Sequence, residues 1–297
     1  MINVSIAGYG RGGIIPLQRK HTFTGRHSRI RRFSLANTIL FVHGAWVTPL
    51  CWADFRSFFE AEGFATLAPA WPFMNRSPGE LRENPDPRLA QVTVGMLVDH
   101  YAAEIRKLPE PPILIGHSFG GLIVQLLLDR GLGSAGIAID PGPPRGVLPG
   151  PRAVISALPV LLAWMGWRRV LSMSFKSFAT TFANRLPGNE MRAVFDRHIV
   201  PAPGRIYFQA ALGLGIGLNF KNPDRAKLLL VAGEEDKTST ISMVRAMYKR
   251  HSRSPARTDF ISFPARSHWL IAEPGWEEVA GGLLEWIRKT EVVPVTQ

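Results

Sequence analysis

The chain has 297 residues, of which 46% are hydrophobic and 20% charged, a size that fits one large domain or one domain with an insertion. Its single cysteine, Cys51, excludes an intrachain disulfide and favours a reducing compartment, so we expect a cytoplasmic protein. The formal net charge is +12, but seven cationic residues lie in residues 1–34, which contain no Asp or Glu. Because the rest of the chain is only mildly basic, we expect no nucleic-acid partner.

Residues 1–34 form a basic N-terminal arm that we predict to be disordered. Its Arg-rich, acid-free composition also resembles a mitochondrial or plastid presequence, so import into an organelle is an alternative. Binding of the arm to nucleic acid is another alternative.

Residues 8–13 match the dinucleotide-binding pattern GxGxxG. Since Pro16 would interrupt the helix that such a site needs, and no acidic residue follows before Asp54, we expect no nucleotide there.

After the arm, short apolar runs bounded by turn residues alternate with stretches whose apolar residues have helical spacing. The predicted strands are residues 38–42, 64–68, 113–115, 135–139, 227–233 and 258–263. The predicted helices are residues 51–62, 88–108, 122–128, 240–251 and 276–288, with a loop at 69–87. In the helix at 88–108, the side chains predicted to be buried are Leu89, Val92, Met96, Tyr101 and Ile105. Strands separated by helices predict an α/β fold, a mostly parallel sheet with helices on both faces.

Residues 145–222 interrupt this alternation, because they contain several apolar stretches but no clear strand. We interpret them as a helical cap inserted between two parts of one core, residues 35–144 and 223–297. The most apolar run, Ala153 to Trp167, is too short to span a membrane and is interrupted by Pro159. A lid over a site, a membrane-surface helix and an oligomer contact all remain open for this segment. As a lid, it would form an apolar pocket.

The sequence GHSFG at residues 116–120 predicts a sharp turn between a buried strand and a helix. At such a turn Ser118 takes up strained backbone geometry, and the residues two positions before and after it must be glycine. Its hydroxyl would be exposed at the carboxyl end of the strand, where a helix N-terminus favours negative charge. A serine that only caps the helix is the alternative, but the strand before it and the helix after it favour a nucleophile.

Asp236 and His268 follow the last two predicted strands, so we expect both at the same edge of the sheet as Ser118. A serine nucleophile needs a base, and the ordinary pKa of histidine suits this task. Asp236 would hold the imidazole in the correct tautomer, with Asp140, which also ends a strand, as the alternative acid. The other candidates, which we interpret as solvated or structural groups, are Glu234, Glu235, His117, His198 and His251.

A second loop at the same edge follows the strand at residues 38–42. A loop in this position can direct a backbone N–H group towards the space above the serine of a neighbouring strand. We expect the oxyanion donors to be the N–H of Ala45 or Trp46 and that of Phe119. His43 in this loop is interpreted as a structural hydrogen-bonding group.

Four sequence blocks together resemble the α/β-hydrolase superfamily. They are FVHGAW (Phe41 to Trp46), GHSFGG (Gly116 to Gly121), LLLVAGEED (Leu228 to Asp236) and RSHWLIAEPGW (Arg266 to Trp276). The resemblance implies that Ser118 is the nucleophile, His268 the base and Asp236 the acid. It also implies an antiparallel strand pair at the start of the fold, which the basic arm matches poorly.

These observations favour a serine hydrolase that cleaves a carboxylic ester of a small apolar or aromatic substrate through an acyl-enzyme intermediate. We expect no cofactor, since the three side chains and two N–H donors supply the chemistry, and no metal, since the histidines are scattered. The same groups also serve lactonases, amidases, perhydrolases and carbon–carbon bond hydrolases. A hydrolase-like receptor that binds a ligand without turnover is a further alternative. The expected partner is a small-molecule substrate; the chain has no predicted membrane span, and its oligomeric state is open.

Overall fold

The computed structural model describes residues 38–291 of the chain. The basic arm at residues 1–34, including its glycine pattern, lies outside the described residues. Its predicted disorder and the alternatives of organellar import and nucleic-acid binding therefore remain predictions.

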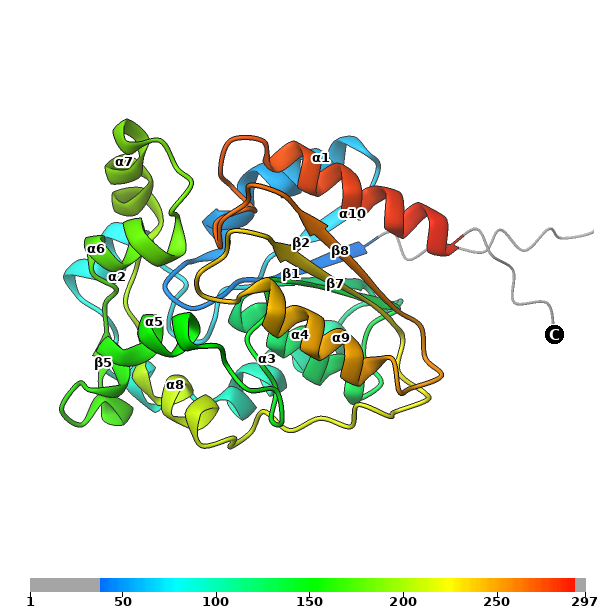
Figure 1. The fold of residues 1–297 in the computed structure, drawn as a ribbon, viewed down its shortest axis with the longest axis horizontal. Helices are drawn as coiled ribbons and strands as arrows, with labels where there is room; N and C mark the ends of the chain where they lie inside the picture. The colour runs from blue at the N-terminus through cyan, green and yellow to red at the C-terminus, as the bar shows by residue number, and fades with distance from the viewer. Residues whose placement is uncertain (1–37, 292–297) are drawn as a thin grey trace, which may run out of the picture. The chain divides into compact units, whose positions relative to one another are not determined.

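Six strands form a central sheet in the order β2-β1-β3-β4-β7-β8, and each neighbouring pair is parallel (Figure 1). Their bounds are β1 Thr38–Val42, β2 Ala65–Leu67, β3 Ile113–His117, β4 Ala135–Ile139, β7 Lys227–Gly233 and β8 Thr258–Phe263. The interior strands β3 and β4 are buried along their whole length, because helices cover both faces of a parallel sheet. This is why their sequences are continuous apolar runs rather than alternating ones. The predicted α/β fold is confirmed.

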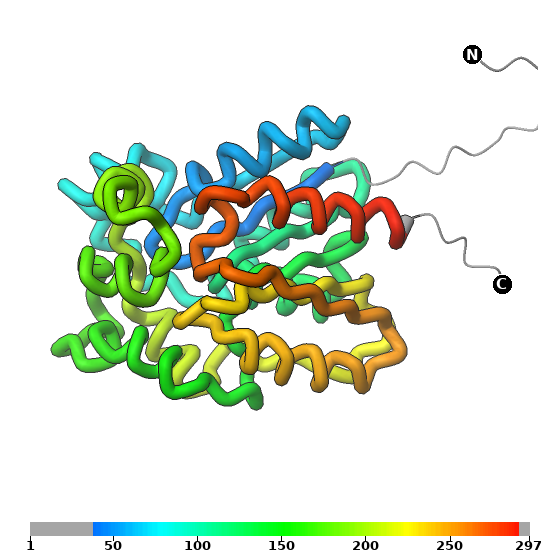
Figure 2. The backbone as a smooth tube through the Cα atoms, turned by 45° about the horizontal axis from the view of Figure 1, so that its top comes forward, coloured from blue at the N-terminus to red at the C-terminus, as the bar shows by residue number. Residues whose placement is uncertain are grey.

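Helices pack on both faces of this sheet (Figures 1 and 2). On one face lie α1 (Ala53–Ala61) and α10 (Trp276–Glu291), which are joined by contacts of Phe55 and Phe58 with the ring of Trp276. On the other face lie α3 (Val94–Arg106), α4 (Phe119–Asp129) and α9 (Ile241–His251). Every residue of α4 from Phe119 to Leu128 is buried. This explains why its sequence lacks a polar face.

The stretch before α3 differs from the prediction. The predicted loop at residues 69–87 contains α2 (Pro78–Glu83), whose capping residue Ser77 exchanges hydrogen bonds with Glu80. The predicted helix at residues 88–108 is divided into a 3-10 helix, η2 (Pro87–Gln91), and α3. Thr93 causes this division, because its hydroxyl accepts the N–H of Met96 and starts a new helix. The prediction that Met96 is buried is also wrong, since its side chain is 41% exposed.

Residues 145–211 lie beyond the carboxyl ends of the central strands, whereas the chain after residue 211 runs back along the sheet to the start of β7 (Figures 1 and 2). Their helices are α5 Pro151–Leu161, η3 Gly166–Arg168, α6 Phe175–Ser177, η4 Phe178–Phe182, α7 Gly188–His198 and α8 Gly204–Ala211. The segment also holds a short antiparallel pair, β5 (Val170–Leu171) and β6 (Ala202–Pro203). The expectation of no strand here was therefore wrong, because runs of two residues leave no periodic pattern in the sequence. Within the described part of the chain, no helix is long and apolar enough to cross a membrane.

Candidate active site

Ser118 occupies the sharp turn between β3 and α4. Its φ of 57° lies in the left-handed region, which a serine adopts only where the surroundings enforce it. A Cβ atom on Gly116 would lie 2.3 Å from the carbonyl oxygen of Gly120, and one on Gly120 would lie 2.0 Å from that of Val42. Both contacts are with backbone atoms, which cannot move aside. The predicted need for glycine on both sides of Ser118 is thus confirmed by the geometry.

The structure brings Ser118, His268 and Asp236 together, although 150 residues separate the serine from the histidine. The Nε2 atom of His268 lies 2.9 Å from the Oγ of Ser118, and its Nδ1 lies 2.6 Å from Oδ2 of Asp236. With Nδ1–H donating to the carboxylate, Nε2 is left as an acceptor for the serine hydroxyl. The histidine and aspartate side chains are fully buried, so water does not compete for this pairing.

Two buried groups hold the loop that carries His268. The Nε2–H of His117 donates to the backbone carbonyl of His268 at 2.7 Å. Glu273 accepts the backbone N–H of Ser267 at 3.0 Å and also its hydroxyl. Burial, and then the neighbouring His268, lowers the pKa of His117 well below its ordinary value. His117 therefore stays neutral and supports the loop instead of acting as a second base.

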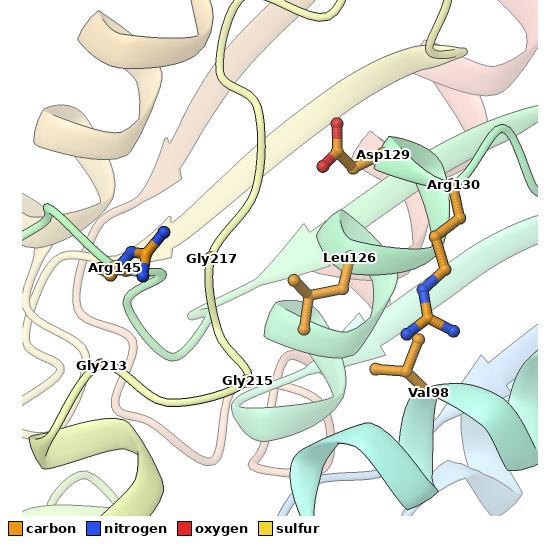
Figure 3. A pocket seen from close by; sticks show the side chains of 8 residues that line it. All are labelled: Val98, Leu126, Asp129, Arg130, Arg145, Gly213, Gly215 and Gly217. Carbon is orange, nitrogen blue, oxygen red and sulfur yellow. The ribbon is translucent and has the colours of Figure 1, made fainter.

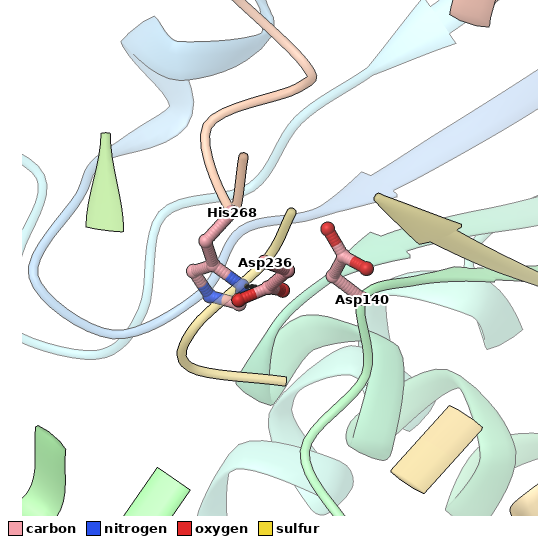
Figure 4. A group of neighbouring side chains, drawn as sticks. All are labelled: Asp140, Asp236 and His268. Atoms are coloured by element: carbon pink, nitrogen blue, oxygen red, sulfur yellow. Dashed lines mark hydrogen bonds and ion pairs between the residues drawn. The ribbon is translucent and has the colours of Figure 1, made fainter. Parts of the chain in front are cut away.

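Asp236 and Asp140 lie next to each other at the ends of β7 and β4 (Figure 4), but their hydrogen bonds differ. Oδ1 of Asp236 accepts the N–H groups of Thr238 and Ser239 at 2.5 and 2.9 Å, and its Oδ2 faces His268. Asp140 accepts one N–H, from Gly233 at 2.9 Å, while its buried Oδ2 has no donor among the described residues. Both oxygens of Asp236 are therefore engaged by neighbouring groups, whereas only one oxygen of Asp140 is.

Burial raises the pKa of Asp140 well above its ordinary value, and the carboxylate of Asp236 raises it further. Both effects favour the neutral form of Asp140. Ligand atoms of Asp140, Asp236 and His268 lie within 4.8 Å of one another, a spacing that a metal ion could also bridge. An ion there would have to replace the hydrogen bond between His268 and Asp236, whereas a proton on Asp140 fits the existing contacts.

The loop after β1 passes directly beside Ser118. A Cβ atom on Gly44 would lie 2.9 Å from Cβ of Ser118 and 3.5 Å from its Oγ. His43 accepts the N–H of Trp71 at Nε2 and contacts the carbonyl of Gly44 through Nδ1, so its predicted hydrogen-bonding role is confirmed. Burial lowers the pKa of His43 to about 4, which keeps it neutral.

The N–H groups expected to bind an oxyanion belong to this loop and to α4. Trp46 has a φ of 63°, and its carbonyl accepts the N–H of Val200, so its backbone is fixed in an uncommon orientation. Phe119 is the first residue of α4, where a helical N–H has no partner within the helix. The direction of the N–H groups of Ala45, Trp46 and Phe119 towards a substrate remains a prediction.

Two aromatic side chains from the segment 145–222 pack against Trp46, Phe119 and His268. The ring of Tyr207, on α8, stacks on Trp46 with centroids 4.7 Å apart and meets the edge of Phe119 at 5.1 Å. The ring of Phe182, in η4, contacts the imidazole of His268 at 4.8 Å. Neither residue was predicted to belong to the site, because aromatic residues in an irregular segment carry no positional signal.

Comparison with known proteins assigns the chain to a family. A profile described as the alpha/beta hydrolase family matches residues 39–281. The chain belongs to the α/β hydrolase family. A search of curated protein sequences found no match.

Solved structures share the α/β hydrolase fold at low sequence identity. A pyrethroid hydrolase from Sphingobium faniae has a TM-score of 0.63 and 20% identity, over 84% of this chain and 97% of that one. A monoacylglycerol lipase from Paleococcus ferrophilus has a TM-score of 0.62 and 18% identity, over 84% and 93%. A methylesterase from Arabidopsis has a TM-score of 0.61 and 15% identity, over 84% and 98%.

Two other histidines considered for this α/β hydrolase, His198 and His251, form no hydrogen bond with Ser118 in the described structure. His251 contacts Oε1 of Gln125 at 3.0 Å through Nε2, and burial lowers its pKa to about 3. His198, at the end of α7, packs against the ring of Trp269, and burial lowers its pKa to about 4. Both are buried, neutral side chains, which agrees with their structural interpretation.

A separate cavity of about 300 Å³ opens at the other end of α4, between α3 and residues 213–217 (Figure 3). Its lining residues are Val98, Leu126, Asp129, Arg130, Arg145, Gly213, Gly215 and Gly217. Asp129 accepts hydrogen bonds from the backbone of Asn219 and the side chain of Asn222. Because this carboxylate already serves to anchor the neighbouring loop, and the cavity contains no residue of the candidate site, we do not place the reaction there.

Proposed function

We propose that this α/β hydrolase is a serine hydrolase that cleaves a carboxylic ester of a small apolar or aromatic substrate. The observation that carries the proposal is the chain of contacts from Ser118 through His268 to Asp236, at 2.9 and 2.6 Å. A free serine hydroxyl hardly ionises near neutral pH, and an oriented imidazole within hydrogen-bond distance removes this obstacle.

In the proposed reaction, Oγ of Ser118 attacks the ester carbonyl carbon while Nε2 of His268 takes the hydroxyl proton. Asp236 stabilises the resulting imidazolium, and the backbone N–H of Phe119 with that of Ala45 or Trp46 binds the oxyanion. The tetrahedral intermediate collapses, the carbon–oxygen bond to the alcohol breaks, and His268 protonates the departing alkoxide. Water then attacks the acyl-enzyme with His268 as base, which releases the carboxylic acid and restores Ser118.

The two carboxyl groups have different roles in this proposal. Asp236 is the charged partner of His268, because both of its oxygens accept hydrogen bonds. A protonated Asp140 would donate to Asp236 and so help to hold it in place. Asp140 is therefore a positioning residue, and its earlier role as the alternative acid is not favoured.

The substrate class is inferred from the surroundings of Ser118. Tyr207 and Phe182 place aromatic rings beside the proposed oxyanion donors and the base, which supports residues 145–222 as a cap with an apolar lining. The structural neighbours include a monoacylglycerol lipase, a pyrethroid hydrolase and a methylesterase. Esters of apolar or aromatic acids or alcohols are therefore the substrates to test first.

The test compares wild type with Ser118→Ala on p-nitrophenyl esters of increasing acyl length, aryl esters and lactones. We expect Ser118→Ala to lower kcat/KM by about 10⁵-fold and to abolish labelling by a fluorophosphonate. Ser57→Ala, an exposed serine on α1, is the matched control and should keep both. Turnover that survives in Ser118→Ala would contradict the proposal, and ligand binding without turnover by wild type would favour a receptor.

A further inference from the structure

The solvent side of α5 is apolar, whereas a surface helix ordinarily turns its polar side to water. We call this surface the α5 face; it consists of Pro151, Val154, Ile155, Leu158, Pro159 and Leu162, all exposed. These positions follow helical spacing and therefore lie on one side of the helix. The opposite side is apolar too, since Ala153 and Val160 are buried in the protein. The protein thus covers only one of the two apolar sides of α5.

Large apolar side chains remain exposed directly after the helix. Leu162 is 77% exposed, Trp164 is 82% exposed and Trp167 is 45% exposed. Single exposed apolar residues are common on protein surfaces, but an apolar helix side followed within a few residues by two exposed tryptophans is a concentration of large apolar side chains, which indicates a partner.

The charged side chains in the sequence around the α5 face are all cationic. Residues 141–189 contain no Asp or Glu. Their cationic residues are Arg145, Arg152, Arg168, Arg169, Lys176 and Arg185. Arg152 is exposed beside the α5 face, and Arg168 and Arg169 are exposed directly after Trp167. The partner of this surface should therefore be apolar and carry negative charge at its edge.

We propose that the α5 face, together with Trp164 and Trp167, docks on the surface of an anionic lipid bilayer. The helix would lie in the plane of the interface, with its apolar side chains at the acyl boundary and the tryptophans at the level of the head groups. Arg168 and Arg169 would then contact lipid phosphates. This inference does not depend on the proposed ester hydrolysis.

A bilayer fits these observations better than a second copy of the chain. In a two-fold symmetric dimer the same patch would meet itself, so the exposed arginines of one copy would approach those of the other. An anionic bilayer offers opposite charge to every arginine and an apolar phase to the α5 face. The contact between α5 and α8 also links this surface to the helix that carries Tyr207.

The first experiment measures co-sedimentation of the full chain with phosphatidylcholine vesicles and with vesicles containing phosphatidylglycerol. We expect binding to the anionic vesicles, weakened about 30-fold by combining Ile155→Ser, Leu158→Ser and Leu162→Ser. These side chains are exposed, so the substitutions should leave the fold intact. Met96→Ser, at an exposed apolar position on α3, is the matched control and should bind as wild type does.

Charge reversal provides an independent variant. Combining Arg168→Glu and Arg169→Glu should weaken binding to the anionic vesicles by about tenfold or more. The matched control combines Lys249→Glu with Arg253→Glu, which changes the net charge equally at exposed positions in and after α9. Equal losses in both variants would mean that net charge alone determines binding and would overturn the proposal.

The basic arm at residues 1–34 could also bind anionic vesicles, so the second experiment reports on α5 itself. Five of the eight tryptophans are buried, and Trp276 is partly buried, which leaves Trp164 and Trp167 for contact with lipid. We expect brominated lipids to quench the tryptophan fluorescence of the wild type. The quenching should disappear when Trp164→Phe and Trp167→Phe are combined.

Two results would overturn the inference. Vesicle binding without quenching would assign the binding to the arm or to general electrostatics. A dimer detected by sedimentation velocity and abolished by the triple serine variant, in the absence of vesicle binding, would assign the α5 face to self-association.

Discussion

The ends of the central strands and the segment 145–222 differ in which kinds of side chain they bury and which they expose. At the strand ends, polar groups are buried, and most are fixed by hydrogen bonds, as Asp236 is by the backbone of Thr238 and Ser239. In the segment, apolar groups such as Leu162 and Trp164 face the solvent. The first region has the fixed geometry that bond-making requires, and the second has uncovered surface suited to binding. Substitutions at the strand ends should therefore affect kcat, and those in the segment should affect affinity.

The largest effect after loss of Ser118 is expected for Asp236→Asn. The amide cannot hold the imidazole in the tautomer that leaves Nε2 free to take a proton, so kcat/KM should fall by about 10⁴-fold. Steady-state kinetics on the best ester measures this change. The matched control is Glu235→Gln, which removes an exposed ion pair with Arg185 and should change activity little. If Asp236→Asn were as active as Glu235→Gln, the proposed role of the fixed strand-end geometry would be wrong.

A smaller effect, on binding, is expected for Tyr207→Ala. This change removes the ring that covers Trp46 and Phe119, so KM for an aryl ester should rise by about tenfold while kcat changes less. Tyr248→Ala on α9, where the ring instead contacts Phe260, is the control. A loss confined to kcat would show that Tyr207 takes part in the chemical step and would remove the distinction between the two regions.

The smallest effect on activity is expected for Asp140→Asn. An asparagine can accept the N–H of Gly233 and donate to Asp236, as a protonated Asp140 does, so kcat/KM should stay within about threefold of wild type. A large loss would instead indicate that Asp140 must ionise and serves as the acid.

The same variant should change how stability depends on pH. Because the pKa of Asp140 is raised in the folded protein, the unfolded chain releases this proton above about pH 3.9 while the folded chain keeps it. The free energy of unfolding of the wild type therefore declines as pH rises through this window. Asp140→Asn lacks this contribution, so the stability of the variant relative to wild type should increase from pH 4 to pH 7. Denaturant titrations at the two pH values measure it, and a constant difference would argue against a buried proton.

Much of the sheet could be predicted from local sequence. Residues 38–42, 135–139, 227–233 and 258–263 are strands with the predicted bounds. For the first three, the reason is that an apolar run between turn residues has few other ways to be buried. The start of α3 was missed, since it depends on one hydroxyl of Thr93 that competes for a backbone N–H. Such local competition leaves no periodic signal.

The candidate site was only partly predictable. Ser118, His268 and Asp236 could be named because each follows a strand, and the carboxyl ends of parallel strands share one edge. The different roles of Asp140 and Asp236 could not be predicted from their positions after strands. Which carboxyl keeps its proton depends on how many N–H groups reach each oxygen and on burial, and both are properties of the assembled loops.

The amino-acid order alone determined where the central strands and the strained serine lie, since these follow from apolar periodicity and from the space that glycine leaves. The tertiary structure decided which side of α5 meets the solvent. Both sides of that helix are apolar, so periodicity could not distinguish them. Packing against the rest of the protein determines which side is buried. It also decided which aromatic rings pack against Trp46, Phe119 and His268, because contacts between distant segments depend on the complete fold.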